Sequence, residues 1–372
     1  MNNYSNNSLI DLYGLPKMEK FKDLEKILRL SGKLVYFLTS DSSQKYETYY
    51  IPKKDNTQRE INAPILALKI VQKWILNNIL YKIKVSPYSY GFYKDGLGSP
   101  LVRCAKKHKE NLFILKIDIK DFFPSISRKR IYRLFSDIGY NSEVSNLLTN
   151  ICVYDDKLPQ GAVTSPYLAN LVCKNLDTRI ATYCNKRDIV YTRYADDLTF
   201  SSDNRDLLKN IYGVICKILR TEGFDINNKK TIFMTPKNHK KILGITVNNS
   251  LIKAPKDLKR KVRSMIHISM ATGNYTLNLQ IIGYISYINS IETDYTERIK
   301  KYILKLSESP LCTIKELVDA YNDNKIFNDL PNMVLKDAES FVDAQNAETF
   351  YKEVYTEYLN FMTSHKGTIS LT

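Results

Sequence analysis

The chain has 372 residues, and its 55 Lys and Arg against 39 Asp and Glu give a formal net charge of +16 at pH 7. A hydrophobic content of 44% excludes a wholly disordered chain, and the positive charge favours a polyanionic partner, most often nucleic acid. Residues 311–372 are acidic, with five Lys against ten Asp and Glu, so the basic character is confined to residues 1–310.

The cysteines and the apolar stretches exclude several classes of protein. The six cysteines form no CxxC pair and only four His are present, so we predict reduced, buried thiols rather than a zinc site or a disulfide framework. The N-terminus lacks a basic-then-apolar signal sequence. The longest weakly polar stretch, residues 279–291, is shorter than the ~18 residues that span a bilayer. We therefore expect a soluble, cytoplasmic protein with no membrane partner.

The first part of the chain predicts a helical start, a strand and a further helix. Residues 1–30 carry an apolar stripe with a period of 3.6, which indicates helix. Residues 46–52 are strand-like and lead into a polar turn over residues 53–57. Asn62 and Pro64 then predict a helix start, and the apolar residues that follow recur on one helical face.

The remaining elements alternate between strand and helix before the pattern becomes purely helical. In chain order they are a strand over residues 112–117, a helix from residue 165 to about 180, strands over 189–194 and 198–201, a helix around 207–215, a strand over 242–247, and a basic helical stretch over 255–307. This order predicts an α+β body followed by a helical module.

Two adjacent aspartates, Asp196 and Asp197, lie in the turn between two predicted strands. Their charges repel, and a divalent cation relieves this repulsion because hard cations prefer carboxylate oxygens. Asp118 ends another predicted strand and is placed to supply a third carboxylate. Such a trio would complete a two-metal site that activates a 3′-hydroxyl and stabilises a leaving pyrophosphate. Taken alone, the Asp pair also fits an ordinary acidic turn.

Three motifs, in order, resemble those of reverse transcriptases. Residues 191–198 (YTRYADDL) resemble the YxDD motif of that family. Residues 115–126 (LKIDIKDFFPSI) are similar to its first catalytic-carboxylate motif, and residues 158–166 (LPQGAVTSP) to its LPQGxxxSP motif. The resemblance implies an α+β right-hand polymerase fold with fingers, a palm with an antiparallel sheet, a helical thumb and a short helical C-terminal extension.

The resemblance also implies limits for the domains. They are an N-terminal helical extension over residues 1–45, fingers over 46–111 that continue in part through 125–165, a palm over 112–250, a thumb over 251–310 and an acidic extension over 311–372. Within the family, the bacterial retron group is most similar, on residues 59–64 (REINAP) and 86–92 (SPYSYGF) as well as the catalytic motifs. Two retron signatures are altered: NAxxH reads CAKKH, with Cys104 in place of Asn, and VTG reads ILG.

The resemblance assigns the metal and sugar sites residue by residue. Asp118, Asp196 and Asp197 would bind two Mg²⁺ ions, for which Mn²⁺ is a possible substitute, and the carbonyl of Ile119 would assist. Phe123, five residues after Asp118, matches the aromatic residue that excludes a 2′-OH and so selects deoxynucleotides. The alternative for Phe123 is a core phenylalanine.

Further residues match the positions that hold the incoming nucleotide. Gln160 and Gly161 would contact it, and Lys53 and Arg59 would hold its triphosphate, a task that suits the forked guanidinium of Arg. Lys230 matches the lysine proposed to protonate the leaving pyrophosphate, with the adjacent lysine as an alternative. Lys53 also fits a solvated turn.

A basic surface is predicted for the helical module and for one upstream position. Because basic residues interleave with apolar ones after residue 255, we expect the basic side chains to follow phosphates, with an affinity that falls with salt, although a solvated helix face fits too. The predicted nucleic-acid contacts are His108, Lys256, Lys259, Arg260, Lys261 and Arg263.

These features together predict a retron-type reverse transcriptase. It would copy a structured noncoding RNA into single-stranded DNA from dNTPs, start at a 2′-OH of a guanosine and leave a branched RNA–DNA product. The resemblance also implies a ribonucleoprotein that restrains a companion effector protein in antiphage defence. The alternatives are another bacterial defence-associated or group II intron-like reverse transcriptase and, in a different class, a non-catalytic RNA-binding scaffold.

Overall fold

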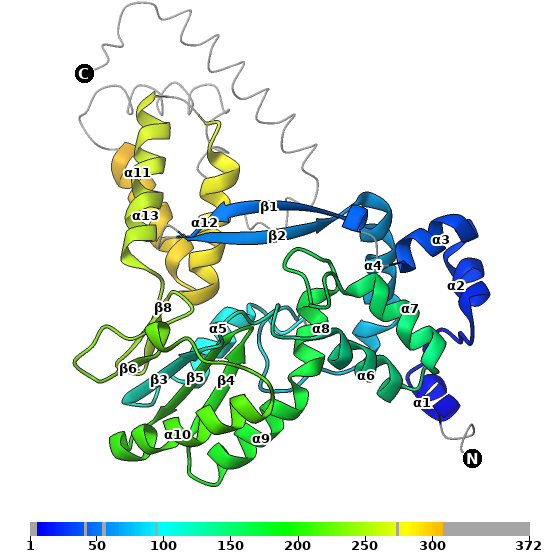
Figure 1. The fold of residues 1–372 in the computed structure, drawn as a ribbon. Helices are drawn as coiled ribbons and strands as arrows, with labels where there is room; N and C mark the ends of the chain where they lie inside the picture. Colours follow the sequence, from blue (N-terminus) through cyan, green and yellow to red (C-terminus); the bar gives the residue numbers. More distant parts are fainter. Residues whose placement is uncertain (1–5, 41–42, 54–56, 94–95, 273–274, 308–372) are drawn as a thin grey trace, which may run out of the picture. The chain divides into compact units, whose positions relative to one another are not determined.

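A computed structural model describes residues 6–40, 43–53, 57–93, 96–272 and 275–307 of the chain (Figure 1). The chain divides into two compact units, Met1–Lys240 and Lys241–Thr372. The acidic extension predicted over 311–372 and most of the predicted turn over 53–57 lie outside the described residues.

The first unit begins with short helices, an isolated hairpin and a longer helix. Its elements up to residue 107 are α1 (Asn6–Leu12), α2 (Phe21–Leu28), α3 (Gly32–Thr39), η1 (Ser43–Lys45), β1 (Tyr46–Pro52), β2 (Gln58–Pro64), α4 (Leu66–Asn78), η2 (Leu80–Lys82) and α5 (Pro100–Lys107). The helix predicted here is present as α4, but it begins at Leu66 rather than at Asn62 and Pro64. Those residues belong to β2, which pairs with β1 from Tyr46↔Pro64 to Pro52↔Gln58, and this ladder satisfies backbone groups that a helix would otherwise use.

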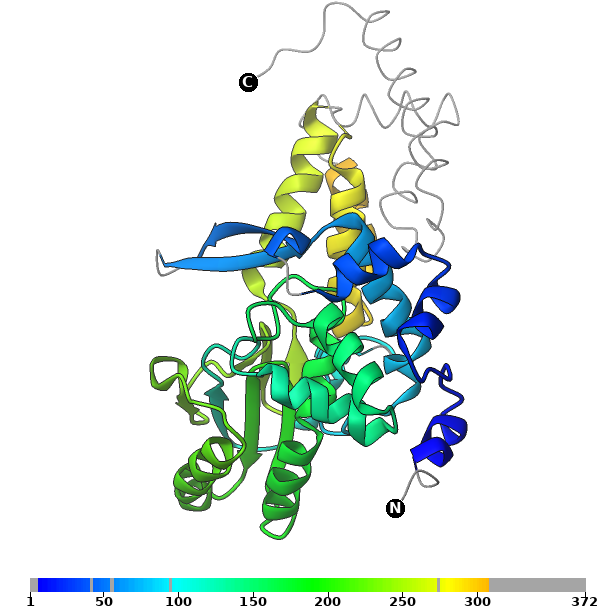
Figure 2. The same cartoon turned by 45° about the vertical axis from the view of Figure 1, so that its right-hand side comes forward.

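This unit also contains a four-stranded antiparallel sheet, which can be followed in Figure 1 and, from another side, in Figure 2. Its remaining elements are β3 (Phe113–Asp118), α6 (Arg128–Ile138), α7 (Ser142–Cys152), α8 (Ser165–Val172), α9 (Lys174–Asn185), β4 (Val190–Tyr194), β5 (Asp197–Ser202), α10 (Arg205–Thr221), η3 (Asn228–Lys230) and β6 (Ile232–Met234). The strand order is β4-β5-β3-β6. The single helix predicted from residue 165 is two helices, α8 and α9, separated at Cys173.

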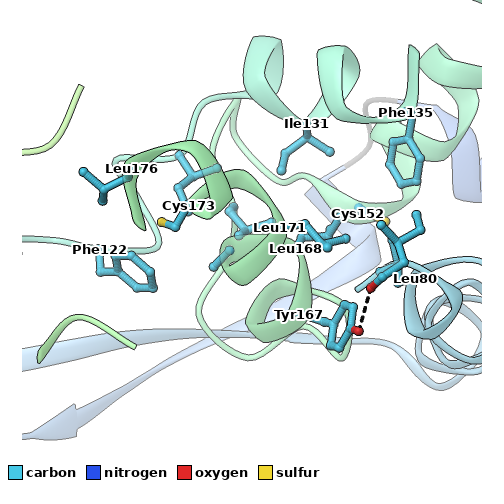
Figure 3. Close-up of a cluster of buried hydrophobic side chains, with 14 of the residues drawn as sticks. Leu80, Phe122, Ile131, Phe135, Cys152, Tyr167, Leu168, Leu171, Cys173 and Leu176 are labelled. Atoms are coloured by element: carbon cyan, nitrogen blue, oxygen red, sulfur yellow. Dashed lines mark hydrogen bonds between the residues drawn. The ribbon is translucent and has the colours of Figure 1, made fainter. Parts of the chain in front are cut away.

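The hydrophobic core of the first unit is continuous from the sheet to the helices. Figure 3 shows side chains of α6, α7, α8 and α9 meeting in it, among them Phe135, Leu168 and Leu176. The hydroxyl of Tyr167 donates a hydrogen bond of 2.9 Å to the carbonyl of Ile83, so its one polar atom is satisfied inside the core (Figure 3). The described cysteines are free and buried, as predicted: Cys104, Cys152, Cys173, Cys184 and Cys216.

The second unit contains a small sheet and three helices. Its elements are β7 (Lys241–Ile242), β8 (Ile245–Asn248), β9 (Leu251–Lys253), α11 (Lys256–Thr272), α12 (Asn278–Ile291) and α13 (Tyr295–Ser307). The strand predicted over residues 242–247 is two strands, because Leu243 and Gly244 adopt positive φ angles of 50° and 82° and turn the chain back. Among the described helices of the whole chain, none has the length and apolar character needed to cross a bilayer.

Candidate active site

The three predicted aspartates lie at the same end of the four-stranded sheet. Asp118 is the last residue of β3 and Asp197 the first of β5, and the two are directly opposite in the antiparallel register. The backbone N–H of Ile119 donates a bond of 2.9 Å to the carbonyl of Asp196, which ties the turn before β5 to the end of β3. Stretches about 80 residues apart in sequence thus bring their carboxylates to one place, as the sequence predicts.

The turn between β4 and β5 has a left-handed residue that is held from outside. Ala195 adopts φ 57°, an uncommon value for a residue with a side chain. The guanidinium of Arg193 donates a bond of 3.2 Å to the Ala195 carbonyl. Gly91 packs against the same turn, because a Cβ at Gly91 would lie only 2.8 Å from the Ala195 nitrogen. The conformation that presents Asp196 is therefore fixed by tertiary contacts.

Arg193 itself is anchored by a fully buried ion pair. Its Nε and Nη2 each donate a bond of 2.7 Å to one carboxylate oxygen of Asp177 on α9, and both side chains are 0% exposed. The hydroxyl of Tyr191 donates a further bond of 2.8 Å to Asp177, and Arg193 Nη1 donates one of 3.1 Å to Asn170 on α8. Two helices are thus bonded to the strand that leads into the aspartate pair.

Lysines compensate part of the acidic charge. Lys230 Nζ lies 3.2 Å from Asp118 Oδ1, and Lys116 Nζ lies 3.6 Å from Asp197 Oδ1. Burial raises the pKa of Asp196, and the negative charges of Asp118 and Asp197 raise it further. The carboxylates are therefore close enough to repel one another.

The site fits a divalent cation in the chemistry of its donors, but it is not preformed as a metal cage. Carboxylate oxygens are the ligands that Mg²⁺ prefers, and a cation would relieve the repulsion that raises the Asp196 pKa. Over the described ranges of the chain, however, no group of three or more His, Cys, Asp and Glu side chains is arranged to hold a metal ion. Metal binding by the trio stays a prediction.

A cavity of about 700 Å³ adjoins the acidic end of the sheet. Of the predicted site residues, its lining includes Lys53, Arg59, Asp118, Ile119, Phe123, Gln160, Asp196 and Lys230. Asp197 and Gly161 are outside that lining. It also contains residues that the sequence analysis did not single out, including Phe92, Lys120, Tyr154 and Lys157. Its volume falls within the range of ordinary ligand pockets, and its cations suit an anionic ligand.

The loop that carries Gln160 and Gly161 is bonded to β2 and to α4. The backbone N–H of Asn62 donates a bond of 2.7 Å to the Gln160 carbonyl. Gly161 adopts φ +125°, and a Cβ there would lie 2.6 Å from the Asn62 carbonyl oxygen, so only glycine fits. The fully buried amide of Gln72 accepts a bond of 3.1 Å from the N–H of Val163. These contacts hold Gln160 at the cavity wall.

The predicted nucleic-acid contact of His108 is wrong. Its side chain is 0% exposed, and its two ring nitrogens lie 2.7 Å from the hydroxyls of Ser201 and Thr192. Burial lowers the pKa of His108 to about 3, so the ring stays neutral. Cys104, one turn earlier on α5, contacts the same Thr192 hydroxyl at 3.2 Å. The CAKKH element therefore joins α5 to β4 and β5 inside the protein.

The basic residues of α11 differ in exposure rather than in having a partner. Lys256, Arg260, Lys261 and Arg263 are exposed, although Lys261 donates a bond of 3.0 Å to the Tyr284 hydroxyl and the Arg263 guanidinium lies 5.3 Å from the Tyr302 ring centroid. Lys259 is only partly exposed, and its ammonium donates a bond of 2.8 Å to Glu292, which also accepts bonds from Arg298 and from the N–H of Ala254. Burial alone would raise the pKa of Glu292, but these donors lower it overall. Lys259 thus has a structural partner within the second unit.

The structure adds supporting residues that sequence reasoning missed. Arg193 and Gln72 were noted only as parts of motifs, and Asp177 and Asn170 were not singled out, because nothing in their local sequence distinguishes them from exposed polar residues of a helix. A charged residue in such a pattern is usually exposed. The spacing of residues in the sequence does not predict the helix–strand packing that buries these groups together.

An antiparallel sheet whose acidic end adjoins a cation-lined nucleotide-sized cavity is the arrangement of a right-hand nucleic-acid polymerase. Residues 51–247 match the family described as reverse transcriptase (RNA-dependent DNA polymerase). The retron Ec86 reverse transcriptase of Escherichia coli is 35% identical over 307 residues, which cover 82% of this chain and 95% of that protein. The retron Mx65 reverse transcriptase of Myxococcus xanthus is 28% identical over 312 residues, covering 78% and 72%. The chain belongs to the bacterial retron reverse transcriptases.

The chain is accordingly an RNA-directed DNA polymerase, with RNA as its template and DNA as its product. Among solved structures, a telomerase from Candida albicans in complex with a fragment of telomeric RNA is similar at 12% sequence identity and a TM-score of 0.44. The match covers 88% of this chain and 66% of that one.

Proposed function

We propose that this enzyme copies a structured noncoding RNA into single-stranded DNA by nucleotidyl transfer at the acidic end of the sheet. Synthesis starts from a 2′-OH of a guanosine in that RNA and leaves a branched RNA–DNA product. The observation that carries the proposal is the register pair Asp118↔Asp197, with Asp196 in the adjacent turn, next to a cavity lined by several cations.

The residues around the cavity divide the work of the reaction. Asp118, Asp196 and Asp197 would hold two Mg²⁺ ions, with the Ile119 carbonyl as a further ligand, and Mn²⁺ could substitute. When bound, the two ions supply a more acidic attacking hydroxyl and neutralise the leaving pyrophosphate. Lys230 gives the leaving group a proton, a role supported by its ammonium lying 3.2 Å from Asp118.

The incoming dNTP is held by the rest of the lining. Lys53 and Arg59 bind the triphosphate as charge-assisted donors. Gln160 contacts the nucleotide from a loop that backbone bonds fix to β2, and Gly161, next to it but outside the lining, contacts the nucleotide through its backbone. Phe123 lies beneath the sugar, where its ring fills the volume that a 2′-OH would need.

The remaining parts of the proposal concern partners and setting. The exposed basic residues of α11, Lys256, Arg260, Lys261 and Arg263, follow phosphates of the RNA–DNA hybrid. The enzyme, its RNA and its DNA product form a cytoplasmic ribonucleoprotein that restrains a companion effector protein in antiphage defence. Folded RNA is recognised mainly by shape and by single-stranded loops.

Substitution of one carboxylate tests the chemistry. With template, primer, dNTPs and Mg²⁺, Asp197→Asn should lower extension by at least about a thousandfold, because several kcal/mol of charge stabilisation are lost. Its affinity for the RNA should stay nearly the same, since phosphate contacts dominate binding. The matched control is Asp206→Asn, an exposed carboxylate in α10 that should extend like the wild type. Equal extension by the Asp197 variant and the wild type would refute the proposed site.

A further inference from the structure

Phe92 occupies the cavity in a strained backbone conformation. It has a φ of 60°, which is a real outlier for a bulky residue, and its side chain is 39% exposed within the lining of the cavity. Strain of this kind costs on the order of 1–3 kcal/mol and persists only where surrounding contacts impose it. A functional role of the Phe92 ring would therefore explain why this conformation is kept.

The Phe92 ring contacts the proposed sugar residue and the strand that leads to the aspartates. Its centroid is 5.9 Å from that of Phe123 and 6.4 Å from that of Tyr194, both in tilted arrangements. Phe123 has a second aromatic neighbour in Phe122, at 5.4 Å on the core side. Phe123 thus lies against one buried ring and one ring in the cavity.

The segment before Phe92 is bonded to the same buried scaffold that fixes the β4–β5 turn. Arg193 N–H donates a bond of 2.8 Å to the Tyr88 carbonyl, and Tyr90 N–H donates one of 2.8 Å to the Arg193 carbonyl. The amide of Asn170 donates a bond of 2.6 Å to the carbonyl of Gly91. The residue immediately before Phe92 is therefore held by α8 and by the edge of β4.

We propose that Phe92 is a second specificity-determining residue for deoxynucleotides, which backs Phe123 and closes the sugar side of the cavity. The inference rests on the proposed function, because it extends the assignment of Phe123. The site can reject one added hydroxyl only if the side chains that fill the space of that hydroxyl cannot move aside. A single half-buried ring can move aside at little cost, whereas a ring packed between two others must displace them. The scaffold and the strained backbone keep Phe92 in the place where it prevents that movement.

The test compares kcat/KM for a deoxynucleotide and the matching ribonucleotide in purified full-length enzyme with its RNA. Phe92→Ala should lower the discrimination ratio about tenfold, the scale at which a hydrophobic pocket separates such analogues. Phe92→Leu, which keeps more of the volume, should give an intermediate decrease. Phe92→Ala/Phe123→Ala should discriminate no worse than Phe123→Ala alone, because the two rings act as one wall.

Controls separate this inference from a general loss of structure. Phe233→Ala removes another half-buried ring, stacked on Phe113 at 6.2 Å and absent from the cavity lining, and should leave the ratio unchanged. If Phe92→Ala folds poorly by thermal melting, the Leu variant carries the test. An unchanged ratio in both Phe92 variants, with a lowered ratio in Phe123→Ala, overturns this inference and leaves the role of Phe123 intact. An unchanged ratio in the Phe123 variant overturns both.

Discussion

The support beneath the β4–β5 turn and the β1–β2 hairpin are built in opposite ways. Beneath the turn, Arg193 and Asp177 are completely buried, outside the lining of the cavity, and bonded to each other at 2.7 Å. On the hairpin side, Lys53 and Arg59 are exposed and belong to the lining. One side thus has charges fixed inside the protein, and the other has charges that water surrounds.

This difference matches what each side has to do. Carboxylates that act in a reaction must keep their positions within a fraction of an ångström, which requires supporting residues locked by packing and hydrogen bonds. Groups that hold a triphosphate bind a new ligand in every cycle and release a product, so long exposed side chains serve them well. Stability should therefore depend on the buried side, and substrate affinity on the exposed side.

The largest effect is expected on removal of the buried charge of Asp177. Asp177→Asn leaves the Arg193 guanidinium in the core without a counter-charge, which should lower the free energy of unfolding by about 3–5 kcal/mol. Equilibrium denaturation in urea measures this loss. The matched control is Asp11→Asn, which breaks an exposed ion pair with Lys17 of 2.8 Å and should cost less than about 1 kcal/mol. Similar losses of unfolding free energy in the two variants would contradict the expected difference between buried and exposed charges.

A smaller effect, dependent on pH, is expected from His108. Burial lowers the pKa of folded His108 to about 3 from the ordinary histidine value of 6.5, so below pH 6.5 the unfolded chain takes up a proton that the folded protein excludes. Relative to His108→Gln, the wild type should therefore lose about 1.4 kcal/mol of stability per unit as pH falls from 6.5 toward 3. Urea denaturation at several pH values measures the difference.

The control for that experiment is Asn111→Ala. Asn111 donates a bond of 2.7 Å to the same Ser201 hydroxyl that His108 contacts, but it exchanges no proton. Its loss of stability should be the same at each pH. If the free energies of unfolding of the wild type and His108→Gln differ by the same amount at every pH, the inference that His108 is buried in its neutral form is refuted.

The smallest effect on stability is expected on the exposed side. Arg59→Gln should change the free energy of unfolding by less than about 0.5 kcal/mol, because the side chain is exposed. It should nevertheless raise the KM for dNTP roughly tenfold, since a charge-assisted bond to phosphate is lost. Steady-state kinetics measures the change, and Lys73→Gln, an exposed lysine of α4 outside the cavity lining, should leave KM unaltered. An unchanged KM in Arg59→Gln would refute the proposed contact between Arg59 and the triphosphate.

The sequence predicted the acidic end of the sheet because short buried strands have a plain signature. Residues 112–117 and 189–194 are apolar or alternating runs that end at polar turns, and both form strands within a residue of the prediction. By contrast, β2 has only one buried residue and has neither pattern. Its Asn62 and Pro64 are typical of helix starts, and only pairing with β1 makes them a strand.

The residues that support the site could not be predicted from the sequence, for a different reason. A motif match assigns a role to a position but says nothing of its burial, and so His108 was predicted at the surface and lies in the core. The partners of Arg193 are 16 and 23 residues away, on two helices, and no local rule joins them. Such groups become visible only when the packing of helices on the sheet is known.

The pairing of Asp118 with Asp197 across two strands also limits which insertions and deletions the gene can tolerate. A single inserted or deleted residue within β3 or β5 would send every following side chain to the other face of the sheet and separate the two carboxylates. The exposed connection between α9 and β4 at residues 186–188 meets no such condition, because a longer loop alters only a small entropy of closure. Changes in length should therefore accumulate in such surface connections, while the strands that carry the acidic trio admit substitutions alone.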